Sequence, residues 1–409
     1  MRVCFLTSSY PRFPEDPAGV FIHSLARSLV RQGCEVEVIA PRGNATSSFE
    51  IREGVHINRF PYFFRRYEKF AHAPGGIPPA IRNHPWLTLL LPFFFASFFA
   101  HALNHSRRVD VFHFHWLQNA LLAFPLKFFS SRPTVATLWG TDVQWIESSR
   151  PLRVLTRTIA SRMDSIVSVN DYFRTKLSSF GFSDNIRVIP NGVDLDRFGP
   201  ADCVSLRAKA GLPSDAALVL YVGSLIERKG VRYLIEAMSH VARSNSGPVV
   251  LAIVGSGEER ESLARAACSL GLERSVLFVG SIPPNEIPAW LRCADLFVLP
   301  SLYEGRPNVV LEALAAEVPV IATDIPGTRE IVIHGQNGLL VPPRNSHALA
   351  EAITQLIKDR FKRERMGKAG RKMILQLGLT WDDIARQYLS LYQELGKSLR
   401  QNNSTMAND

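Results

Sequence analysis

Two glutamates stand eight residues apart in the segment SLYEGRPNVVLEAL, and their surroundings differ. Glu304 lies in a stretch marked by glycine and proline, whereas Glu312 lies among valine, leucine and alanine residues. An ionised carboxylate with apolar neighbours is unfavourable unless hydrogen-bond donors or a cation satisfy it. The two hydroxyl groups of a ribose diol are suitable donors. The alternative for Glu312 is a structural partner, such as a nearby arginine or amide.

The same segment predicts a junction between a strand, a loop and a helix. LFVLPS has the pattern of a buried strand, LYEGRPN follows its carboxyl end, and VVLEALAAE has the pattern of a helix. Pro307 suits the first helical position, so the amides of Asn308, Val309 and Val310 are expected to be unpaired donors. Such a helix end attracts phosphate through its amides and its dipole. The segment therefore predicts a site for a ligand with phosphate and hydroxyl groups.

Strand and helix patterns alternate along two halves of the chain. The strand patterns are RVCFLTSS, EVEVIA, VDVFHFHW, TVATLWG and SIVSVN, then ALVLYVGS, VVLAIVGSG, VLFVGS, LFVLPS and VPVIAT. This alternation predicts an α/β fold with doubly wound parallel sheets, which bind ligands at the carboxyl ends of their strands. The turn-rich segment PNGVDLDRFGPAD separates the halves. We expect Rossmann-like domains at residues 1–195 and 200–378, and a disordered tail at 400–409.

The charge and cysteine patterns limit the partners and the compartment. The net charge is +10, and residues 1–195 hold 22 Lys and Arg against 14 Asp and Glu. A basic half indicates an anionic partner: nucleic acid, a phosphorylated substrate or anionic lipid. The five cysteines are scattered without CxxC spacing, which favours neither a disulfide framework nor a zinc site and indicates a reducing compartment. The first apolar run is too short for a signal peptide, so a cytoplasmic location is expected.

Residues 59–108 depart from the alternating pattern. They hold nine of the 25 phenylalanines, and seven Lys and Arg against one acidic residue, Glu68. Within them, Leu87–Ala100 is apolar on every face, but it is shorter than the roughly 20 residues that span a bilayer, and Pro92 interrupts it. Two interpretations are open. The segment is a helix buried in the domain core, or it lies in a membrane interface with arginines against anionic head groups.

Three further patterns could carry chemistry. His113 and His115 alternate on a predicted strand, so both point to one face, and the residues alone favour a structural role for the pair. The DLD sequence at 194–196 has the spacing of a carboxylate metal site, but its place between the two halves indicates turn chemistry. GSGEER contains a lone GxG, and no GxGxxG follows the first strand, so a nicotinamide site is not predicted.

Taken together, these motifs resemble those of the family 4 retaining glycosyltransferases, also called group 1 glycosyltransferases. The Glu304–Glu312 segment is similar to the E-x7-E signature of that family. Matching segments in the same order are DVFHFHW, TLWGTDV, IRVIPNGVDLDRF, VGSLIERKGVRYLIEAM, GTREIVIHGQNGLLVPP and TWDDIARQYLSLY. The resemblance implies a GT-B fold, with two Rossmann-like domains facing a central cleft and a C-terminal helix, 380–398, crossing back onto the first domain.

The resemblance also assigns roles in the second domain, which binds the donor in this family. Glu312 matches the glutamate that holds the ribose, and Glu304 matches the one near the hydroxyls of the donor sugar. The amides that follow, from Gly305 through Asn308, Val309 and Val310, would approach the sugar and the diphosphate.

Two cations of the second domain would meet the diphosphate. Lys229 matches the lysine that neutralises the departing diphosphate, which is reasonable because charge develops on this leaving group. The usual companion arginine is replaced by Ser224, and Arg228 would substitute for it.

In the first domain, which binds the acceptor in this family, the resemblance selects three positions. His115 matches a functional histidine near the reacting sugar. Gly19 matches a glycine loop that lets the backbone approach the donor, with Ala18 in place of a second glycine. Trp139 replaces a common histidine, which makes Asp142 a weaker site candidate.

The function implied is transfer of a hexose from a nucleotide sugar to a lipid-linked or saccharide acceptor with retained configuration, in the synthesis of cell-envelope polysaccharide or glycolipid. The family uses no bound metal, and the nucleotide sugar is a substrate, so we expect no cofactor and no nucleic-acid partner. We expect a cytoplasmic protein, on the inner face of the membrane if residues 59–108 meet anionic lipid. The alternatives are a GT-B-like sugar-nucleotide epimerase and a non-catalytic, membrane-associated protein that binds sugar nucleotides.

Overall fold

The structure is a computed structural model that describes residues 1–43, 46–68, 70–73, 77–182, 185–244 and 247–406. The chain divides into two compact units, which we call unit 1 (Met1–Asn191 with Trp381–Asp409) and unit 2 (Gly192–Thr380). Sequence patterns placed the change of domain between residues 195 and 200. In the structure it comes slightly earlier, because the amide of Val193 already donates to the carbonyl of Leu379 in unit 2, at 2.9 Å.

Unit 1 contains an eight-stranded sheet in the order β3-β4-β2-β1-β5-β6-β7-β8. Its strands are β1 (Arg2–Leu6), β2 (Glu35–Pro41), β3 (Phe49–Arg52), β4 (Val55–Phe60), β5 (Val111–His115), β6 (Thr134–Leu138), β7 (Ser165–Ser168) and β8 (Ile186–Val188). Only the β3–β4 hairpin is antiparallel among these pairs. The strand order reverses between β1 and β5, so the loops after these two strands diverge. Doubly wound sheets bind ligands at such a point.

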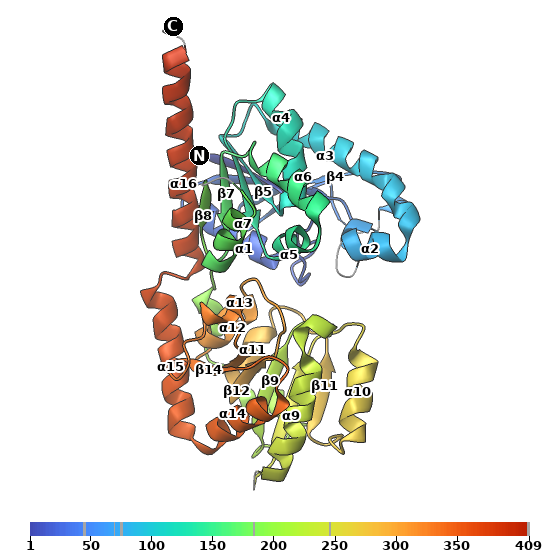
Figure 1. The fold of residues 1–409 in the computed structure, drawn as a ribbon, viewed down its shortest axis with the longest axis vertical. Helices are drawn as coiled ribbons and strands as arrows, with labels where there is room; N and C mark the ends of the chain where they lie inside the picture. Colours follow the sequence, from blue (N-terminus) through green and yellow to red (C-terminus); the bar gives the residue numbers. More distant parts are fainter. Residues whose placement is uncertain (44–45, 69, 74–76, 183–184, 245–246, 407–409) are drawn as a thin grey trace. The chain divides into compact units, whose positions relative to one another are not determined.

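Helices and short 3-10 turns cover the sheet of unit 1 (Figure 1). They are α1 (Val20–Arg31), η1 (Arg65–Tyr67), η2 (Phe70–His72), α2 (Ile77–Asn83), η3 (Pro85–Leu90), α3 (Leu91–His105), η4 (Leu117–Leu122), α4 (Ala123–Phe129), α5 (Thr141–Ser148), α6 (Arg150–Ala160), α7 (Asp171–Ser179) and α16 (Trp381–Met406). The start of α16 packs on α1 and adds Trp381, Tyr388 and Tyr392 to the core of unit 1.

The last helix is longer than the sequence suggested. Its helical bonds continue through residues 400–406, where the composition predicted a disordered tail. A helix whose first turns are docked extends without a new nucleation cost, so polar residues can follow in helical form. Residues 407–409 of the predicted tail lie outside the described residues.

Unit 2 contains a parallel six-stranded sheet in the order β11-β10-β9-β12-β13-β14. Its strands are β9 (Ala217–Val222), β10 (Val249–Val254), β11 (Val276–Gly280), β12 (Leu296–Leu299), β13 (Val320–Thr323) and β14 (Gly338–Val341). Its helices are η5 (Leu195–Phe198), α8 (Cys203–Lys209), η6 (Glu227–Lys229), α9 (Val231–Ser244), α10 (Arg260–Ser269), α11 (Ile287–Cys293), α12 (Asn308–Ala315), α13 (Pro326–Arg329), α14 (Ser346–Lys358) and α15 (Arg360–Gln376). The order reverses between β9 and β12. Two doubly wound α/β units confirm the predicted fold class.

The prediction that the cysteines form no disulfide is wrong. Cys203 at the start of α8 and Cys293 at the end of α11 are bonded, with Cα atoms 5.2 Å apart. The two residues are 90 positions apart in the chain, so sequence spacing carries no sign of the pairing. It arises because the fold packs α8 against α11. Cys4 and Cys34 are buried free thiols, and Cys268 is an exposed one.

The apolar segment of unit 1 is exposed along one side. Residues Pro85–His105 form a 21-residue helical stretch that is long and apolar enough, by length and composition alone, to cross a membrane, and 28% of its most apolar 18 residues is buried. Pro92 lies in the first turn of α3, where proline is tolerated. Phe94 and Phe98 are buried, whereas Leu89 is 73% exposed and Phe93 is 55% exposed. Burial in the core therefore accounts for only one face of Leu87–Ala100.

Candidate functional site

Two loops of unit 2 meet at the point where its strand order reverses. Residues 223–230 follow β9, and residues 300–307 follow β12. The amide of Leu302 donates to the carbonyl of Arg228 at 2.8 Å, which joins the loops directly. Gly230 has φ 63°, and a Cβ at this position would lie 2.2 Å from the carbonyl oxygen of Pro300. Only glycine permits this close approach of the two backbones.

These loops bring two predicted site residues into contact. The Lys229 ammonium lies 2.5 Å from Oε1 of Glu304, and the Ser301 hydroxyl donates to the same oxygen at 2.6 Å. The side chains of Lys229 and Glu304 are 16% and 7% exposed. A phosphate group would therefore compete with Glu304 for the Lys229 cation.

A second cation lies next to Lys229. Arg228 is partly exposed, and its guanidinium has no ion-pair or hydrogen-bond partner among the described residues. Ser224, which occupies the position expected for arginine, is exposed, and its carbonyl accepts the hydroxyl of Tyr221 at 2.9 Å. The loop after β9 therefore offers one paired cation and one that is available to an anion.

Glu312 lies on α12 between the buried residues Leu311 and Ala313 and is itself partly exposed. In the described part of the chain, its carboxylate has no hydrogen-bond or ion-pair partner. Burial raises the pKa of Glu312, and the positive charge of Arg197 opposes this shift. Arg197 does not pair with it, since its guanidinium donates to the carbonyl of Pro284 at 2.7 Å. The structural partner that the sequence left open for Glu312 is therefore not found in the described residues.

The start of α12 differs slightly from the prediction. Pro307 is the N-cap residue, and Asn308 is the first helical residue, with no side-chain cap. The amide of Val310 donates to the carbonyl of Pro307 at 3.1 Å, so the prediction that this amide is unpaired is wrong. Val309 is the second residue of α12 and lies in its first turn. The positive end of the helix dipole still lies directly after the Glu304 loop.

Sequence reasoning missed two glycine contacts that shape this site. A Cβ at Gly327, in α13, would lie 2.4 Å from the carbonyl oxygen of Glu304 and 2.5 Å from that of Gly305. A Cβ at Gly255 would lie 1.9 Å from the carbonyl oxygen of Gly223. The lone GxG of residues 255–257 therefore serves close packing between the loops after β9 and β10. The signal available in the sequence was the position of each glycine: Gly255 directly follows the strand β10, and Gly327 directly follows Pro326.

The two histidines of β5 in unit 1 have different surroundings, although both are fully buried. The ring nitrogens of His113 lie 2.7 Å from the Tyr392 hydroxyl and 2.7 Å from the Thr137 hydroxyl, and burial lowers its pKa to about 3. Neither ring nitrogen of His115 has a hydrogen-bond partner among the described residues, and burial lowers its pKa as well. His113 therefore has a structural role in the hydrogen bonding of unit 1. No hydrogen bond among the described residues explains why a histidine is buried at position 115.

The local backbone geometry of unit 1 requires a glycine at position 19. It precedes α1 with φ 68°, and a Cβ there would lie 2.7 Å from the carbonyl oxygen of Ser9. This contact explains the glycine without a ligand. The predicted approach of the Gly19 backbone to a donor stays a prediction.

The residue after His115 has a strained backbone. Trp116 has φ 64° and ψ 137°, a conformation that glycine adopts easily and a bulky residue rarely does. Such strain costs roughly 1–3 kcal/mol and is found at functional sites where the surroundings enforce it. The Trp116 amide donates to the Thr137 carbonyl at 3.0 Å, and the Asn119 amide donates to the Trp116 carbonyl at 3.1 Å.

Asp142 joins the residue after Trp116 to the loop after β6. Its carboxylate accepts the amides of Leu117 at 3.3 Å, Trp139 at 3.1 Å and Gly140 at 2.9 Å. Burial raises the pKa of Asp142 to about 6, and the backbone donors oppose this shift. Asp142 therefore positions the loops after β5 and β6.

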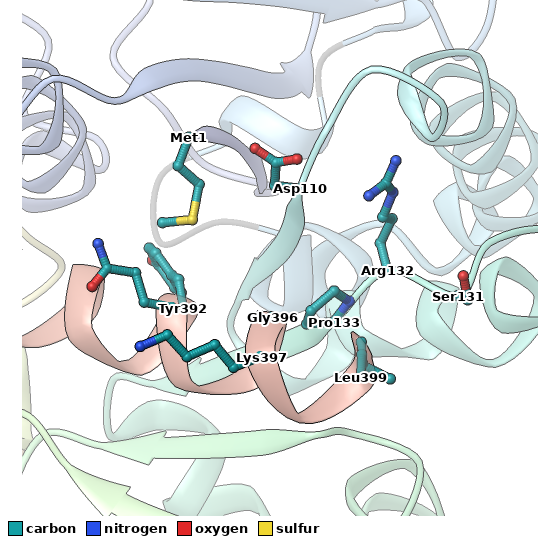
Figure 2. Close-up of a pocket in the computed structure, with 10 residues that line it drawn as sticks. Met1, Asp110, Ser131, Arg132, Pro133, Tyr392, Gly396, Lys397 and Leu399 are labelled. Atoms are coloured by element: carbon teal, nitrogen blue, oxygen red, sulfur yellow. The ribbon is translucent and has the colours of Figure 1, made fainter. Parts of the chain in front are cut away.

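A predicted turn and a cavity complete the description of the two units. The side chain of Asp194 accepts the amide of Asp196 at 3.2 Å, so the DLD sequence has the predicted turn role. A cavity of about 350 Å³ in unit 1 is lined by residues that include Asp110, Arg132, Tyr392 and Lys397. Figure 2 shows Tyr392 and Lys397 on the helix side of this cavity and Asp110 and Arg132 across from them. It lies at the amino ends of β5 and β6, opposite the edge that carries His115.

Comparison with known proteins agrees with this arrangement. Residues 205–373 match the family model "Glycosyl transferases group 1", and residues 18–197 match "Glycosyltransferase Family 4". The chain is 34% identical over 277 residues to a GDP-mannose-dependent alpha-(1-6)-phosphatidylinositol monomannoside mannosyltransferase of Mycobacterium tuberculosis, covering 65% of this chain and 71% of that one. It is 30% identical to a glycogen synthase of the same organism, covering 98% and 96% of the two chains.

A solved structure has the same fold. Sucrose-phosphate synthase from Thermosynechococcus elongatus matches with a TM-score of 0.81 at 24% identity, covering 97% of this chain and 100% of that chain. Family models, relatives and fold thus lead to one assignment. The protein is a member of the group 1 glycosyltransferases of family 4, with the GT-B fold, and moves a sugar from a nucleotide sugar to a saccharide or lipid acceptor.

Proposed function

We propose that the protein transfers a hexose with retained configuration and without a bound metal or cofactor, and that unit 2 holds the donor. The observation that carries this proposal is the group of charges at the switch point of unit 2. Lys229 and Glu304 are paired across two loops, Arg228 lies beside them, and Glu312 has no partner among the described residues. A nucleoside diphosphate sugar offers the complementary groups.

Each of these residues has a distinct task in the proposed reaction. The carboxylate of Glu312 accepts hydrogen bonds from the ribose hydroxyls, which supplies the donors that this half-buried group lacks. When the bond between the hexose C1 and the diphosphate oxygen breaks, the electron pair stays on the diphosphate. Lys229 and Arg228 stabilise this added negative charge. An acceptor hydroxyl forms the new bond to C1 and passes its proton to the leaving diphosphate.

Glu304 would change partners as the donor binds. Its carboxylate pairs with Lys229 and Ser301 in the structure, and a diphosphate would draw Lys229 away. The freed carboxylate could then accept hydrogen bonds from sugar hydroxyls in the same loop. The positive end of α12 and the backbone near Gly305 lie beside the phosphates in this arrangement.

Unit 1 has the features of a surface that meets a membrane. Leu89 and Phe93 on the segment 85–105 are exposed, and so are Phe128 (72%) and Phe129 (65%) on α4. The rings of Phe99 and Phe129 lie 6.1 Å apart, which joins the two helices into one apolar surface. Scattered large apolar residues are normal, but a contiguous patch indicates an interaction site. With the positive charge of residues 1–195, it supports binding to anionic lipid on the inner face of the cytoplasmic membrane.

The donor can be identified without knowledge of the acceptor. A thermal-shift panel of UDP, GDP, ADP and their hexose derivatives should raise the melting temperature for one base only, by mass action. Incubation with that nucleotide sugar alone should give slow release of free hexose and no epimer, whereas an epimer would support the epimerase alternative. Absence of any shift would contradict the proposed donor site. NMR of a transfer product, with and without EDTA, would test retention and metal independence.

Membrane binding has its own test. Sedimentation with phosphatidylglycerol vesicles should retain the protein, and phosphatidylcholine vesicles should retain it poorly. The Phe128→Asp variant should stay in the supernatant. Ile51→Asp is the matched control, because Ile51 is 59% exposed on the edge strand β3, apart from this patch. Equal retention of Phe128→Asp and the native protein would contradict the proposed surface.

A further inference from the structure

An aromatic cluster lies at the carboxyl edge of the unit 1 sheet, next to His115. The ring centroids of Phe21 and Trp139 lie 4.5 Å apart, and those of Phe21 and Trp116 lie 6.1 Å apart. Trp139 also stacks on His115, with centroids 5.8 Å apart and ring planes 23° apart. Phe21, Trp116 and Trp139 are each partly exposed at the border of the unit 1 core. Phe21 lies in the first turn of α1, and Trp116 and Trp139 directly follow β5 and β6, so all three lie around the switch point of this sheet.

Two of these residues are held in arrangements that packing alone does not explain. Trp116 keeps an unfavourable backbone conformation, although glycine would occupy the position without strain. The indole nitrogen of Trp139 is buried and has no hydrogen-bond partner among the described residues, like both ring nitrogens of His115. Buried polar groups are normally paired, and exceptions gather at functional sites.

The strain at Trp116 is enforced from several sides. The Asn119 side chain donates to the His115 carbonyl at 2.6 Å, and the Asp142 carboxylate accepts the amide of Leu117 at 3.3 Å. Both side chains are buried, with Asn119 1% and Asp142 3% exposed. The backbone on each side of Trp116 is therefore fixed by buried polar groups. If position 116 needed only an apolar residue for packing, the buried hydrogen bonds of Asn119 and Asp142 that fix its backbone would not be required.

We propose that Phe21, Trp116 and Trp139 form a stacking surface for the sugar ring of the acceptor. A pyranose ring presents a face of C–H groups that packs on an aromatic plane, while its hydroxyls need polar partners such as the Trp139 indole and the His115 imidazole. The inference rests on the proposed function, because it assumes that unit 1 takes the acceptor. It goes beyond that function by assigning a pyranose, rather than a bare lipid phosphate, as the group recognised there.

The test uses the full chain and simple glycosides as probes. Saturation-transfer NMR, with irradiation of the aromatic protons, is recorded with methyl α-D-glucopyranoside, methyl α-D-mannopyranoside and methyl α-D-galactopyranoside. At least one glycoside should receive saturation, strongest on the C–H groups of one ring face. Trp116→Ala should weaken the affinity by about tenfold or more, as expected for loss of one stacked ring, and Trp116→Phe should retain most of it.

Controls separate stacking from folding and from the donor site. Trp139→Phe keeps a ring but removes the N–H, so it should lower the affinity less than Trp139→Ala. Phe49→Leu, at a 49% exposed aromatic on β3, should bind the glycosides like the native protein. The nucleotide-induced thermal shift should be unchanged in every variant, which shows that each one is folded.

Each outcome is decisive. The inference is overturned if no glycoside receives saturation, or if the Trp116 and Trp139 alanine variants bind as the native protein does. It is also overturned if uridine or guanosine competes with the glycoside, since the rings would then stack on a base. If glycosides bind as expected but no nucleotide shifts the melting temperature, the proposed donor site fails and the stacking surface stands.

Discussion

Replacement of Glu312 by glutamine should stabilise the free protein and weaken donor binding at the same time. Glu312 is a partly exposed carboxylate on an apolar helix, with no partner among the described residues and a pKa raised by burial. A charge kept in such a place lowers the stability of the free protein. Glutamine keeps the shape but removes the charge, so the fold should gain stability while the donor site loses affinity.

The size of both effects follows from hydrogen bonding. A buried polar group without a partner costs roughly 1–3 kcal/mol, so Glu312→Gln should raise the free energy of unfolding by an amount near the lower end. Two hydrogen bonds from ribose hydroxyls to a carboxylate contribute roughly 1.5–3 kcal/mol each. Their loss, roughly 3–6 kcal/mol together, corresponds to binding of the nucleotide that is weaker by at least about a hundredfold.

The stability gain should depend on pH in a definite direction. Burial raises the pKa of Glu312 in the folded chain above its ordinary value of 4.5. Folded protein therefore holds this proton more tightly than unfolded protein does, and the native protein loses stability as pH rises through the range that starts at that value. Glu312→Gln has no such loss. The stability difference should be small below this range, grow as pH rises and then level off above the raised pKa.

Urea unfolding across a pH series and calorimetric titration with the nucleoside diphosphate would measure both quantities. Glu351→Gln is the matched control, since Glu351 is an exposed glutamate on α14 and its replacement should change neither stability nor affinity. A Glu312→Gln protein that is less stable than the native one would show that the carboxylate has a structural partner. Unchanged nucleotide affinity would remove Glu312 from the donor site.

Two further predictions concern unit 2. Lys229→Ala should reduce turnover by about 10²–10³-fold, because the charge on the leaving diphosphate is no longer stabilised. It should also lower the free energy of unfolding by about 3 kcal/mol, because Glu304 is left without its cation. The double variant Lys229→Met, Glu304→Gln should recover the stability but not the turnover, and recovery of turnover would exclude the proposed role. Cys203→Ser should lower the free energy of unfolding by about 4.6 kcal/mol, from the entropy of the 90-residue loop that the disulfide closes. Urea unfolding with and without a reductant measures this change, with Cys268→Ser as the control, and equal stability under both conditions would contradict it.

Local patterns predicted the fold class well because each unit is built from short repeated junctions. A buried strand, a glycine-marked loop and a helix follow one another in both halves, and each junction is visible within about ten residues. The loop of Glu304 and the helix of Glu312 could be placed in this way. Their neighbour Gly230, directly after η6, is marked by its residue type alone.

Features that depend on distant contacts were not predicted. The Cys203–Cys293 bond links helices that only the finished fold brings together. The pairing of Lys229 with Glu304 depends on the order of β9 and β12 in the sheet, which sequence patterns do not specify. The strain at Trp116 is enforced by hydrogen bonds that involve η4, β6 and α5, and nothing in the residue type indicates a positive φ.

The hydrogen bond between Leu302 and Arg228 has a consequence for changing this protein's donor preference. Because the loops after β9 and β12 share a backbone contact, and because Gly230 leaves no room beside Pro300, neither loop can change its length or path alone. They form one exchangeable part. Grafts that transfer residues 223–230 and 300–307 together from one parent should fold, whereas grafts of a single loop should collide at Gly230. Variation within the family should likewise occur in both loops at once.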